Sequence, residues 1–282
     1  MRNALHSVAV SAVLAGLVTL CPVRAMAEAP QRVVSMNLCT DQLAMLLADP
    51  GQLISVSRIA SDPRSSAMVA QAAQYPANSG LAEDVFMMQP DVVVAGSFTA
   101  RASVNMLERL GIKVITFQPA AALDEVRDRI IQMGEALGHP ERAAMMVKEF
   151  DAQLADYLRE VEVRPRAALY YANGYTLGDK TLAGQILAAA GFDNIAAEAG
   201  FEGGGILPLE VLAMAQPDTV ITSRKYPAAS RSEAVMDHPV IGALRRARPE
   251  AALTDSDWVC GTPFVLQAIA DMTDLRQHMT DQ

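Results

Sequence analysis

The chain has 282 residues, of which 51% are apolar and only 5% are aromatic, and its formal net charge is −9. This length allows one or two domains, and the apolar fraction is large enough for a sizeable core. The negative charge argues against a nucleic acid or an anionic membrane as the partner, although it leaves room for a local basic pocket.

Residues 1–27 have the features of an export signal. A short basic start precedes an apolar run over 8–20, which is too short to span a membrane comfortably. Residues 25–27 read Ala-Met-Ala, which fits a small-x-small cleavage site. We therefore expect export to the periplasm. Lipid anchoring at Cys21 is the less favoured alternative, because leucine before this cysteine and proline after it suit lipidation poorly.

The first part of the mature chain alternates short apolar runs with amphipathic segments. Continuous apolar runs are typical of parallel strands that are buried on both faces, and apolar residues three and four positions apart indicate helices. This order predicts a parallel sheet with right-handed crossovers. We expect strands at 32–36, 53–56, 92–95 and 113–117, and helices at 41–48, at 67–73, from 83, at 100–110 and at 123–137.

A single long helix is expected over 140–161. Its apolar or long-stemmed residues recur every three or four positions, which keeps one face in register over about six turns. Pro140 is tolerated in the first turn, and Pro165 ends the helix because proline cannot donate a hydrogen bond. The alternation then resumes, with strands at 166–171, 219–222 and 251–254, helices at 181–190, from 210, at 238–248 and at 262–278, and a long polar loop at 223–239.

A phrase that precedes the central helix is repeated after it. Residues 83–91 read Glu-Asp-Val-Phe-Met-Met-Gln-Pro-Asp and residues 210–218 read Glu-Val-Leu-Ala-Met-Ala-Gln-Pro-Asp, with an apolar strand after each. The repeat predicts two similar lobes joined by a stiff helix, although helix–turn–strand units could also converge on such a phrase. We expect an α/β fold with two Rossmann-like lobes, 28–138 and 165–282, joined by a long interlobe helix at 139–164.

In open parallel sheets, ligands bind beyond the carboxyl ends of the strands. Arginines and aromatic residues gather just past the predicted strands of both lobes. Arginine binds carboxylate and phosphate in a forked geometry, and aromatic rings supply flat apolar contact, so this mixture predicts a bulky, partly aromatic, anionic ligand. The candidates are Asn37, Cys39, Arg58, Ser97, Phe98 and Arg101 in the first lobe, and Asn173, Tyr175, Arg224, Tyr226, Trp258 and Cys260 in the second.

No catalytic or metal site is expected. The segment 174–181 resembles a phosphate loop but has Asp179 where a glycine must precede the lysine, and the four histidines are not placed to form a metal cage. Cys39 and Cys260 could be free thiols, a disulfide across the cleft or soft metal ligands, and we favour two buried small side chains. A secreted cysteine-dependent enzyme is the alternative of a different class, although no histidine is evidently placed to activate either thiol.

The mature chain resembles the periplasmic substrate-binding proteins of cobalamin and ferric-siderophore ABC importers, which are class III periplasmic binding proteins. The resemblance rests on the two repeated phrases, Leu-Gly-Ile-Lys-Val-Ile at 110–115, the central helix and Thr-Asp-Ser-Asp-Trp at 254–258, in this order. It implies two lobes, a rigid interlobe helix and a shallow cleft, with no enzymatic activity and no intrinsic cofactor. It also implies that the protein, as a monomer, docks on a permease and ATPase complex at the inner membrane through Glu83 and Glu210.

Within this family we expect the ligand to be a ferric siderophore that carries anionic groups, such as a carboxylate or a catecholate. Cobalamin, a corrinoid, and haem are the alternatives. The resemblance implies tyrosines after the second strand for either alternative, but residues 58–63 read Arg-Ile-Ala-Ser-Asp-Pro and include none. The arginines near the strand ends therefore favour an anionic ferric chelate.

Overall fold

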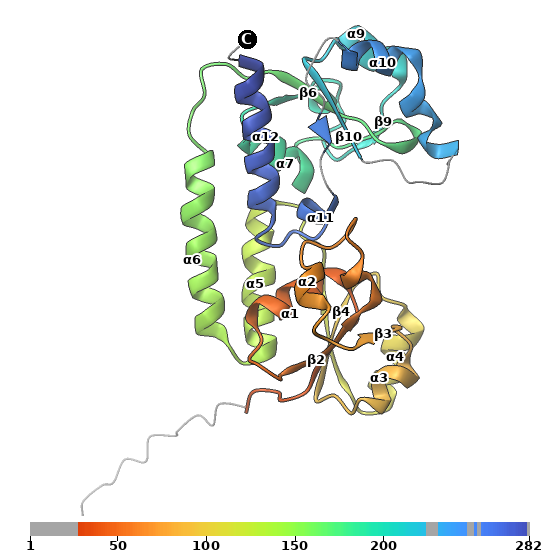
Figure 1. Cartoon of the computed structure of the whole chain (residues 1–282), viewed down its shortest axis with the longest axis vertical. Coiled ribbons are helices and arrows are strands. Elements are labelled where there is room, and N and C mark those ends of the chain that lie inside the picture. Colours follow the sequence, from red (N-terminus) through yellow and green to blue (C-terminus); the bar gives the residue numbers. More distant parts are fainter. Residues whose placement is uncertain (1–27, 224–230, 247–250, 253–254, 281–282) are drawn as a thin grey trace, which may run out of the picture.

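The computed structural model describes residues 28–223, 231–246, 251–252 and 255–280, so the predicted export signal, Cys21 among it, lies outside the described residues. Figure 1 shows two α/β lobes, one above the other, with three long helices along one side. These helices are α5 (Leu123–Leu137), α6 (Pro140–Tyr157) and α12 (Val265–Thr280).

The N-terminal lobe is built on a parallel sheet in the order β3-β2-β1-β4-β5. Val33 faces the apolar cluster formed by α1 and α5, whereas its neighbour Val34 faces the cluster formed by α3 and α4. Helices thus cover both faces of the sheet, which is why its central strands are buried throughout over 33–35 and 92–95. The strands are β1 (Val33–Ser35), β2 (Leu53–Ser57), β3 (Ala77–Asn78), β4 (Val92–Gly96) and β5 (Lys113–Phe117), and the other helices are α1 (Leu38–Leu47), η1 (Arg58–Ser61), α2 (Val69–Ala72), α3 (Ala82–Met87) and α4 (Arg101–Arg109).

The C-terminal lobe repeats this topology. Its parallel sheet has the order β11-β10-β6-β8, which matches β5-β4-β1-β2 of the first lobe, and a small antiparallel pair, β7 and β9, lies beside it. The prediction of two similar lobes is thereby confirmed. The strands are β6 (Arg166–Leu169), β7 (Tyr175–Thr176), β8 (Asp193–Asn194), β9 (Gly205–Ile206), β10 (Thr219–Thr222) and β11 (Ala251–Ala252), and the helices are η2 (Ala172–Gly174), α7 (Leu182–Ala189), α8 (Ile195–Glu198), α9 (Leu209–Ala215), η3 (Arg231–Asp237), α10 (Pro239–Arg246) and α11 (Asp255–Trp258).

The repeated phrase has the same structural role in both lobes. It forms α3 and the turn into β4 in the first lobe, and α9 and the turn into β10 in the second. Asp91 Oδ2 accepts a hydrogen bond of 2.9 Å from the amide of Arg32, just before β1, and Asp218 Oδ2 accepts one of 2.9 Å from the amide of Arg166, which begins β6. The aspartate at the end of each phrase therefore joins the starts of the two central strands of its sheet.

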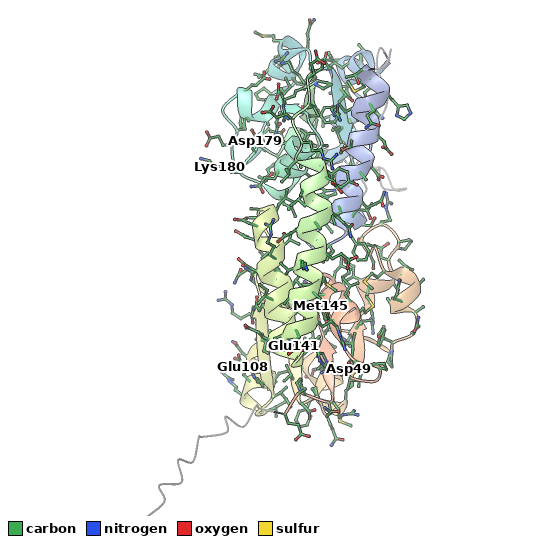
Figure 2. The ribbon with its side chains drawn as sticks, turned by 90° about the vertical axis from the view of Figure 1, so that its left-hand side faces the viewer. Asp49, Glu108, Glu141, Met145, Asp179 and Lys180 are labelled. Atoms are coloured by element: carbon green, nitrogen blue, oxygen red, sulfur yellow. A yellow bond between two sulfur atoms is a disulfide. The ribbon has the colours of Figure 1, made fainter. Side chains whose placement is uncertain are left out.

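Helix α6 connects the lobes and packs against α5 on one side and α12 on the other. Its inner face buries Ala143, Phe150 and Leu154, while Met145, labelled with Glu141 on the outer face in Figure 2, is 66% exposed. The predicted end at residue 161 is wrong, because the helix stops at Tyr157. Residues 158–160 are all exposed, so no packed face supports another turn.

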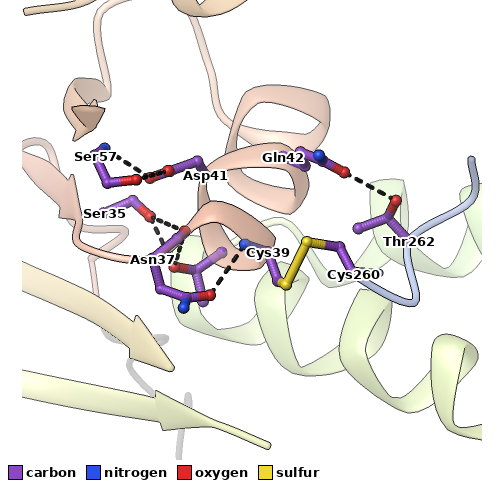
Figure 3. Close-up of a disulfide and its surroundings, with 9 residues drawn as sticks. Ser35, Asn37, Cys39, Asp41, Gln42, Ser57, Cys260 and Thr262 are labelled. Atoms are coloured by element: carbon purple, nitrogen blue, oxygen red, sulfur yellow. Dashed lines mark hydrogen bonds between the residues drawn. A yellow bond between two sulfur atoms is a disulfide. The ribbon is translucent and has the colours of Figure 1, made fainter. Parts of the chain in front are cut away.

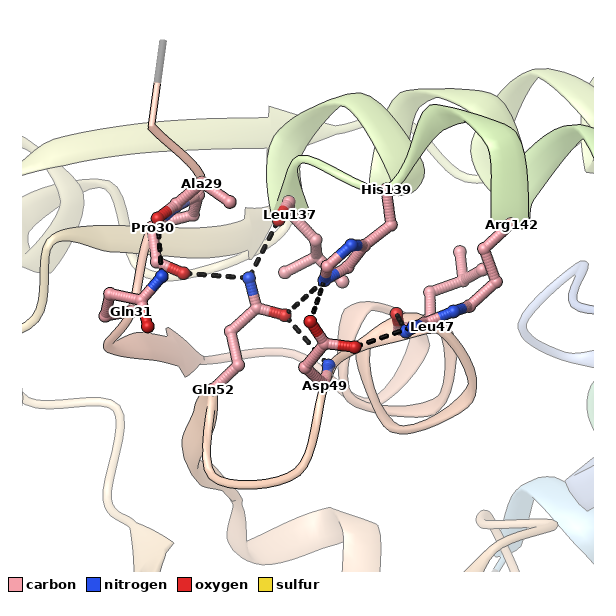
Figure 4. Close-up of polar contacts among 9 residues, drawn as sticks. All are labelled: Ala29, Pro30, Gln31, Leu47, Asp49, Gln52, Leu137, His139 and Arg142. Carbon is pink, nitrogen blue, oxygen red and sulfur yellow. Dashed lines mark hydrogen bonds and ion pairs between the residues drawn. The ribbon is translucent and has the colours of Figure 1, made fainter. Parts of the chain in front are cut away.

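The start of α6 is fastened to the N-terminal lobe by a polar cluster (Figure 4). Gln52 donates hydrogen bonds of 2.8 Å to the carbonyls of Pro30 and Leu137, and its Oε1 lies 2.9 Å from His139 Nε2. Arg142 pairs with Asp49 at 2.6 Å and holds the pKa of this carboxyl below its usual range. The cluster fixes the angle at which α6 leaves the lobe.

The largest apolar cluster crosses from one lobe to the other. It includes Leu43 of α1, Ile130 of α5, Phe150 of α6, Ile186 of α7 and Ile269 of α12, each at most 2% exposed. Because this core is continuous, opening the lobes would expose apolar surface. The arrangement agrees with the rigid interlobe helix that the resemblance implies.

Candidate ligand-binding site

A cavity of about 270 Å³ lies at the carboxyl ends of β1, β4 and β5, and the segment after α11 closes it from the other lobe. Typical pockets for small molecules are about 300–1,000 Å³, so this cavity has room for only part of a bulky ligand. Its lining is largely apolar, with a few polar groups. The lining residues are Asn37, Cys39, Thr40, Leu43, Gly96, Ser97, Phe98, Phe117, Gln118, Pro119, Arg129, Val259 and Cys260.

Asn37 joins β1 to α1 at the edge of the cavity. Its side-chain oxygen accepts a hydrogen bond of 3.0 Å from the amide of Cys39 and so caps α1, which is why the helix begins at Leu38 and not at the predicted residue 41. The Asn37 side chain packs against Gly96 of β4, where an added Cβ would lie 2.7 Å from Asn37 Cγ. A glycine at 96 is therefore what gives this capping residue its space.

Behind the cavity, the buried carboxyl of Asp41 fastens α1 to the end of β2 (Figure 3). Asp41 accepts a hydrogen bond of 3.1 Å from the amide of Ser57 and another from its hydroxyl. Burial raises the pKa of Asp41 to about 6, although hydrogen bonds from Ser35 and Ser57 act in the opposite direction. These bonds hold the residue that immediately precedes Arg58, and so fix where the loop after β2 begins.

Cys39 and Cys260 form a disulfide, with their Cα atoms 4.8 Å apart. The interpretation as two small thiol side chains is therefore wrong. Cys39 lies in the first turn of α1 and Cys260 just after α11, where the lobes meet. Their sequence separation of 221 residues hides this proximity from any local pattern.

Among the described residues that line the cavity, Arg129 is the charged one, and it was not among the predicted site residues. It donates a hydrogen bond of 2.9 Å from Nη1 to Gln132, while its buried Nε has no hydrogen-bond partner in the described part of the chain. It lies well inside α5, not directly after a strand, but helical side chains point back towards the N-terminus of their helix. The sequence signal that could have identified Arg129 is an arginine about two turns into the helix that follows a strand.

The structure brings five predicted site residues together and leaves others apart. Asn37, Cys39, Ser97, Phe98 and Cys260 line the cavity, and Phe98 is 86% exposed at its mouth. Arg58, Arg101, Asn173 and Tyr175 are exposed but do not line it. Trp258 is half-buried and stacks on Tyr171, with ring centroids 6.1 Å apart. Arg224 and Tyr226 lie outside the described residues.

The two predicted docking glutamates occupy equivalent positions on the two lobes. Glu83 lies in the first turn of α3 and Glu210 in the first turn of α9, and both are exposed. Four residues further along, on the same helical face, Met87 is 78% exposed and Met214 is 84% exposed. Each lobe thus presents an acidic group beside an apolar one.

Within the described ranges, no group of three or more histidine, cysteine, aspartate or glutamate side chains is arranged to hold a metal ion. The same residues include no helix with the length and apolar character needed to cross a bilayer.

Residues 33–247 match the family model described as periplasmic binding protein. A cobalamin-binding protein of Halobacterium salinarum is 30% identical over 199 residues, which cover 68% of this chain and 54% of that protein. A vitamin B12-binding protein of Yersinia pestis is 24% identical over 178 residues, which cover 61% and 62% respectively. The chain thus spans between about half and two thirds of these curated relatives.

Solved structures share the fold. The periplasmic heme-binding protein HutB of Vibrio cholerae superposes with a TM-score of 0.73 at 18% identity, over 87% of this chain and 98% of that one. The periplasmic vitamin B12-binding protein BtuF of Vibrio cholerae superposes with a TM-score of 0.65 at 19% identity, over 90% and 99%. With two equivalent lobes, an interlobe helix and a family match over most of its length, the chain belongs to the periplasmic binding proteins and has their class III fold.

Proposed function

We propose that this protein is the solute-binding component of an ABC importer. It takes up a metal chelate between its lobes and delivers the chelate to a permease. The observation that carries the proposal is the cavity at the carboxyl ends of the N-terminal strands, closed by Val259 and Cys260 of the other lobe. This is where an open parallel sheet binds its ligands.

The proposed ligand is an anionic ferric siderophore. Apolar and aromatic side chains form most of the cavity wall, and Arg129 adds a guanidinium whose buried Nε lacks a partner within the described residues. A carboxylate or catecholate group in the cavity would supply a counter-charge for this guanidinium. Since the cavity volume is only about 270 Å³, the rest of the chelate would lie between exposed residues such as Phe98.

Cobalamin or haem is the second candidate, because similar proteins are named for these ligands. The Halobacterium salinarum relative is named a cobalamin-binding protein, and the HutB structure is that of a heme-binding protein. Haem carries two carboxylates and is compatible with Arg129, whereas cobalamin offers this guanidinium neutral amides and a single phosphodiester. The absence of tyrosine from 58–63 disfavours both.

We do not propose the alternative of a secreted cysteine-dependent enzyme. It requires a free thiolate at Cys39 or Cys260, and the two sulfurs are bonded to each other. The proposed activity is solute binding without catalysis.

The proposed partners are the permease and ATPase of the importer at the inner membrane. Glu83 and Glu210 would pair with basic groups of the permease, and the exposed Met87 and Met214 would supply apolar contact beside them. We further propose that the protein is exported by residues 1–27 and acts in the periplasm as a monomer, with lipidation of Cys21 as the less favoured form.

Titration of the mature protein with an anionic ferric siderophore (the tris-catecholate ferric enterobactin), haemin, cyanocobalamin and neutral ferrichrome tests the proposal. Trp258 is the only tryptophan of the chain and immediately precedes Val259 of the cavity wall, so its fluorescence reports binding, with calorimetry as the independent measurement. We expect at least one probe, or a chelate identified by mass spectrometry of the protein purified from its native periplasm, to bind with a Kd of about 1 μM or tighter. No copurified chelate and no binding of any probe would remove the assignment.

A further inference from the structure

Three consecutive residues of the C-terminal lobe, 260–262, contact the N-terminal lobe, and we call this three-residue segment the interlobe seam (Figure 3). Cys260 is bonded to Cys39 of α1. The Thr262 hydroxyl donates a hydrogen bond of 3.1 Å to Gln42 Oε1, and both of these side chains are buried. Beyond the main chain that passes through α6, the disulfide is the covalent connection between the lobes in the described ranges.

The middle residue of the seam shows how closely the lobes approach. Gly261 has a φ of +51°, and an added Cβ would lie 2.5 Å from the Cβ of Ala120 in the N-terminal lobe. A glycine meets both demands, because it adopts positive φ without strain and leaves room for the neighbouring chain. The backbone of the seam therefore packs closely against Ala120 of the other lobe.

The first residue of the interlobe seam, Cys260, also lines the cavity. Val259 and Cys260 line the cavity from one lobe, and Cys39 and Asn37 line it from the other. The disulfide thus sets the distance between two opposing parts of the site. Without it, neutral hydrogen bonds such as those of Gln42 with Thr262 and of Leu123 with Gln185 would remain as polar ties between the lobes, and such bonds are individually weak.

We propose that the Cys39–Cys260 disulfide is a positioning element of the ligand site, holding the wall at Val259 against the edge at Asn37 so that affinity depends on the intact bond. This inference rests on the proposed function of the cavity. A dithiol reductant would supply two electrons and two protons. The S–S bond would break, both cysteines would become thiols, and the dithiol would become a cyclic disulfide.

Binding of a chelate and reduction of the disulfide are thermodynamically coupled. If the intact disulfide raises the affinity for a bound chelate by some factor, the bound chelate must disfavour reduction by the same factor. Cys39 and Cys260 both line the cavity, so an occupant would in addition obstruct the approach of a reductant. Binding and reduction should therefore oppose each other.

The binding test compares the oxidised protein with the Cys39→Ser/Cys260→Ser variant, using ferric enterobactin, haemin, cyanocobalamin and ferrichrome as probes. We expect the variant to bind the recognised probe about tenfold more weakly or worse, because the site is no longer preorganised. Met272→Ala, a core substitution in α12 away from the cavity lining, controls for lost stability and should retain its affinity at temperatures where circular dichroism shows all three proteins folded. Equal affinities of the oxidised protein and the double variant would overturn the inference.

A measurement without any probe separates this inference from the proposed function. Hydrogen–deuterium exchange is followed at 256–262 and 38–42 before and after treatment with a dithiol, together with the emission of Trp258. We expect faster exchange in both segments on reduction, and unchanged exchange in α6. If no probe binds the oxidised protein, the proposed function fails while this result still decides whether the disulfide positions the wall. Unchanged exchange in both segments would refute the positioning role.

Discussion

At the scale of single residues, the chemistry of the cavity depends on one charge within an apolar wall. Arg129 is the charged residue of the lining, and its Nε has no acceptor in the described part of the molecule. A cation in a mostly apolar lining favours an anionic group of a ligand, because charge-assisted contacts are stronger than neutral ones. Arg127, two residues earlier in α5, is instead paired with Asp151 and does not line the cavity.

Arg129→Gln should therefore weaken the binding of an anionic probe such as haemin, while leaving that of neutral ferrichrome nearly unchanged. A charge-assisted hydrogen bond contributes about 1.5–3 kcal/mol, which corresponds to a loss of roughly tenfold to hundredfold in affinity. Calorimetric titration of both probes measures the effect, and Arg127→Gln is the matched control. A loss of equal size for both probes would contradict a specific role for the charge.

Asp41 makes the stability of the fold depend on pH. Its pKa is about 6 in the folded protein against an ordinary value of 3.8, mainly because it is buried. The folded state binds this proton more tightly than the unfolded state does, so the stabilisation is fully present below pH 3.8 and is lost as the pH rises through about 6. At about 1.4 kcal/mol per pH unit between the two values, the loss is roughly 3 kcal/mol.

Asp41→Asn removes this titration. Between about pH 4 and about pH 7, the unfolding free energy of the variant should rise by roughly 3 kcal/mol relative to that of the original protein. Urea denaturation at a series of pH values measures the difference between the two proteins. Carboxyls with a lowered pKa, such as those of Asp49 and Glu198, titrate equally in both proteins. Their contributions therefore cancel in the difference between the two unfolding free energies. Parallel pH profiles would show that Asp41 does not titrate as the structure indicates.

At the scale of elements, the repeated phrase ends each helix in the same unusual backbone conformation. Gln89 has a φ of +48° and Gln216 a φ of +45°, and both precede the Pro-Asp turn into a strand. Arginines support these turns, since Arg32 donates a hydrogen bond of 3.0 Å to the Gln89 carbonyl and Arg166 one of 2.8 Å to that of Ala215. The matching conformations indicate that one turn geometry is needed in both lobes.

A glycine should fit these two positions better than glutamine. A left-handed conformation costs roughly 1–2 kcal/mol for a residue with a Cβ, and glycine is the usual residue just after a helix. Gln89→Gly and Gln216→Gly should each stabilise the protein by about 1 kcal/mol, after the entropic cost of glycine is subtracted. Gln153→Gly in the middle of α6 is the control and should destabilise by about 1 kcal/mol. Thermal denaturation distinguishes these outcomes, and destabilisation by all three would argue against strain at the turns.

At the scale of the whole molecule, the duplication gives the two lobes equivalent surfaces. Glu83 with Met87 on α3, and Glu210 with Met214 on α9, present the same pair of groups. A partner with two equivalent basic sites would therefore meet both lobes at once. The core that runs through α6 fixes the spacing between the two pairs.

Glu83→Ala/Glu210→Ala should abolish transport by a reconstituted importer while leaving chelate binding in solution unchanged. Exposed ion pairs contribute little individually, but they orient and accelerate docking, so loss at both lobes should act mainly on the rate of complex formation. Surface plasmon resonance against the permease complex measures this rate. Glu141→Ala, which removes an exposed first-turn glutamate of α6 outside the repeated phrase (Figure 2), is the control. Undiminished transport in the double variant would refute the docking role.

Much of the architecture could be predicted from local patterns. The apolar runs at 92–95 and 113–117 and the spacing in 123–137 led to the correct strands and helix, because burial on a sheet or a helix face imposes a period that is visible along the chain. The repeated phrase predicted the duplicated topology for the same reason. The end of α6 could not be predicted, since a helical pattern continues to residue 161 but nothing packs against residues 158–160.

Of the site residues, some could likewise be predicted from the sequence and others could not. The rule that ligands bind beyond strand ends led to Asn37, Phe98 and the two cysteines, which the structure places around one cavity. The sequence left a disulfide open as one of three possibilities for the cysteines, and only the tertiary structure decided for it. Arg129 came only from the tertiary structure, because its place in the lining depends on how elements far apart in the chain approach one another. Periodicity records which face of an element is buried, whereas the distance between two faces is set by the packing of both lobes on α6, and no local pattern encodes that distance.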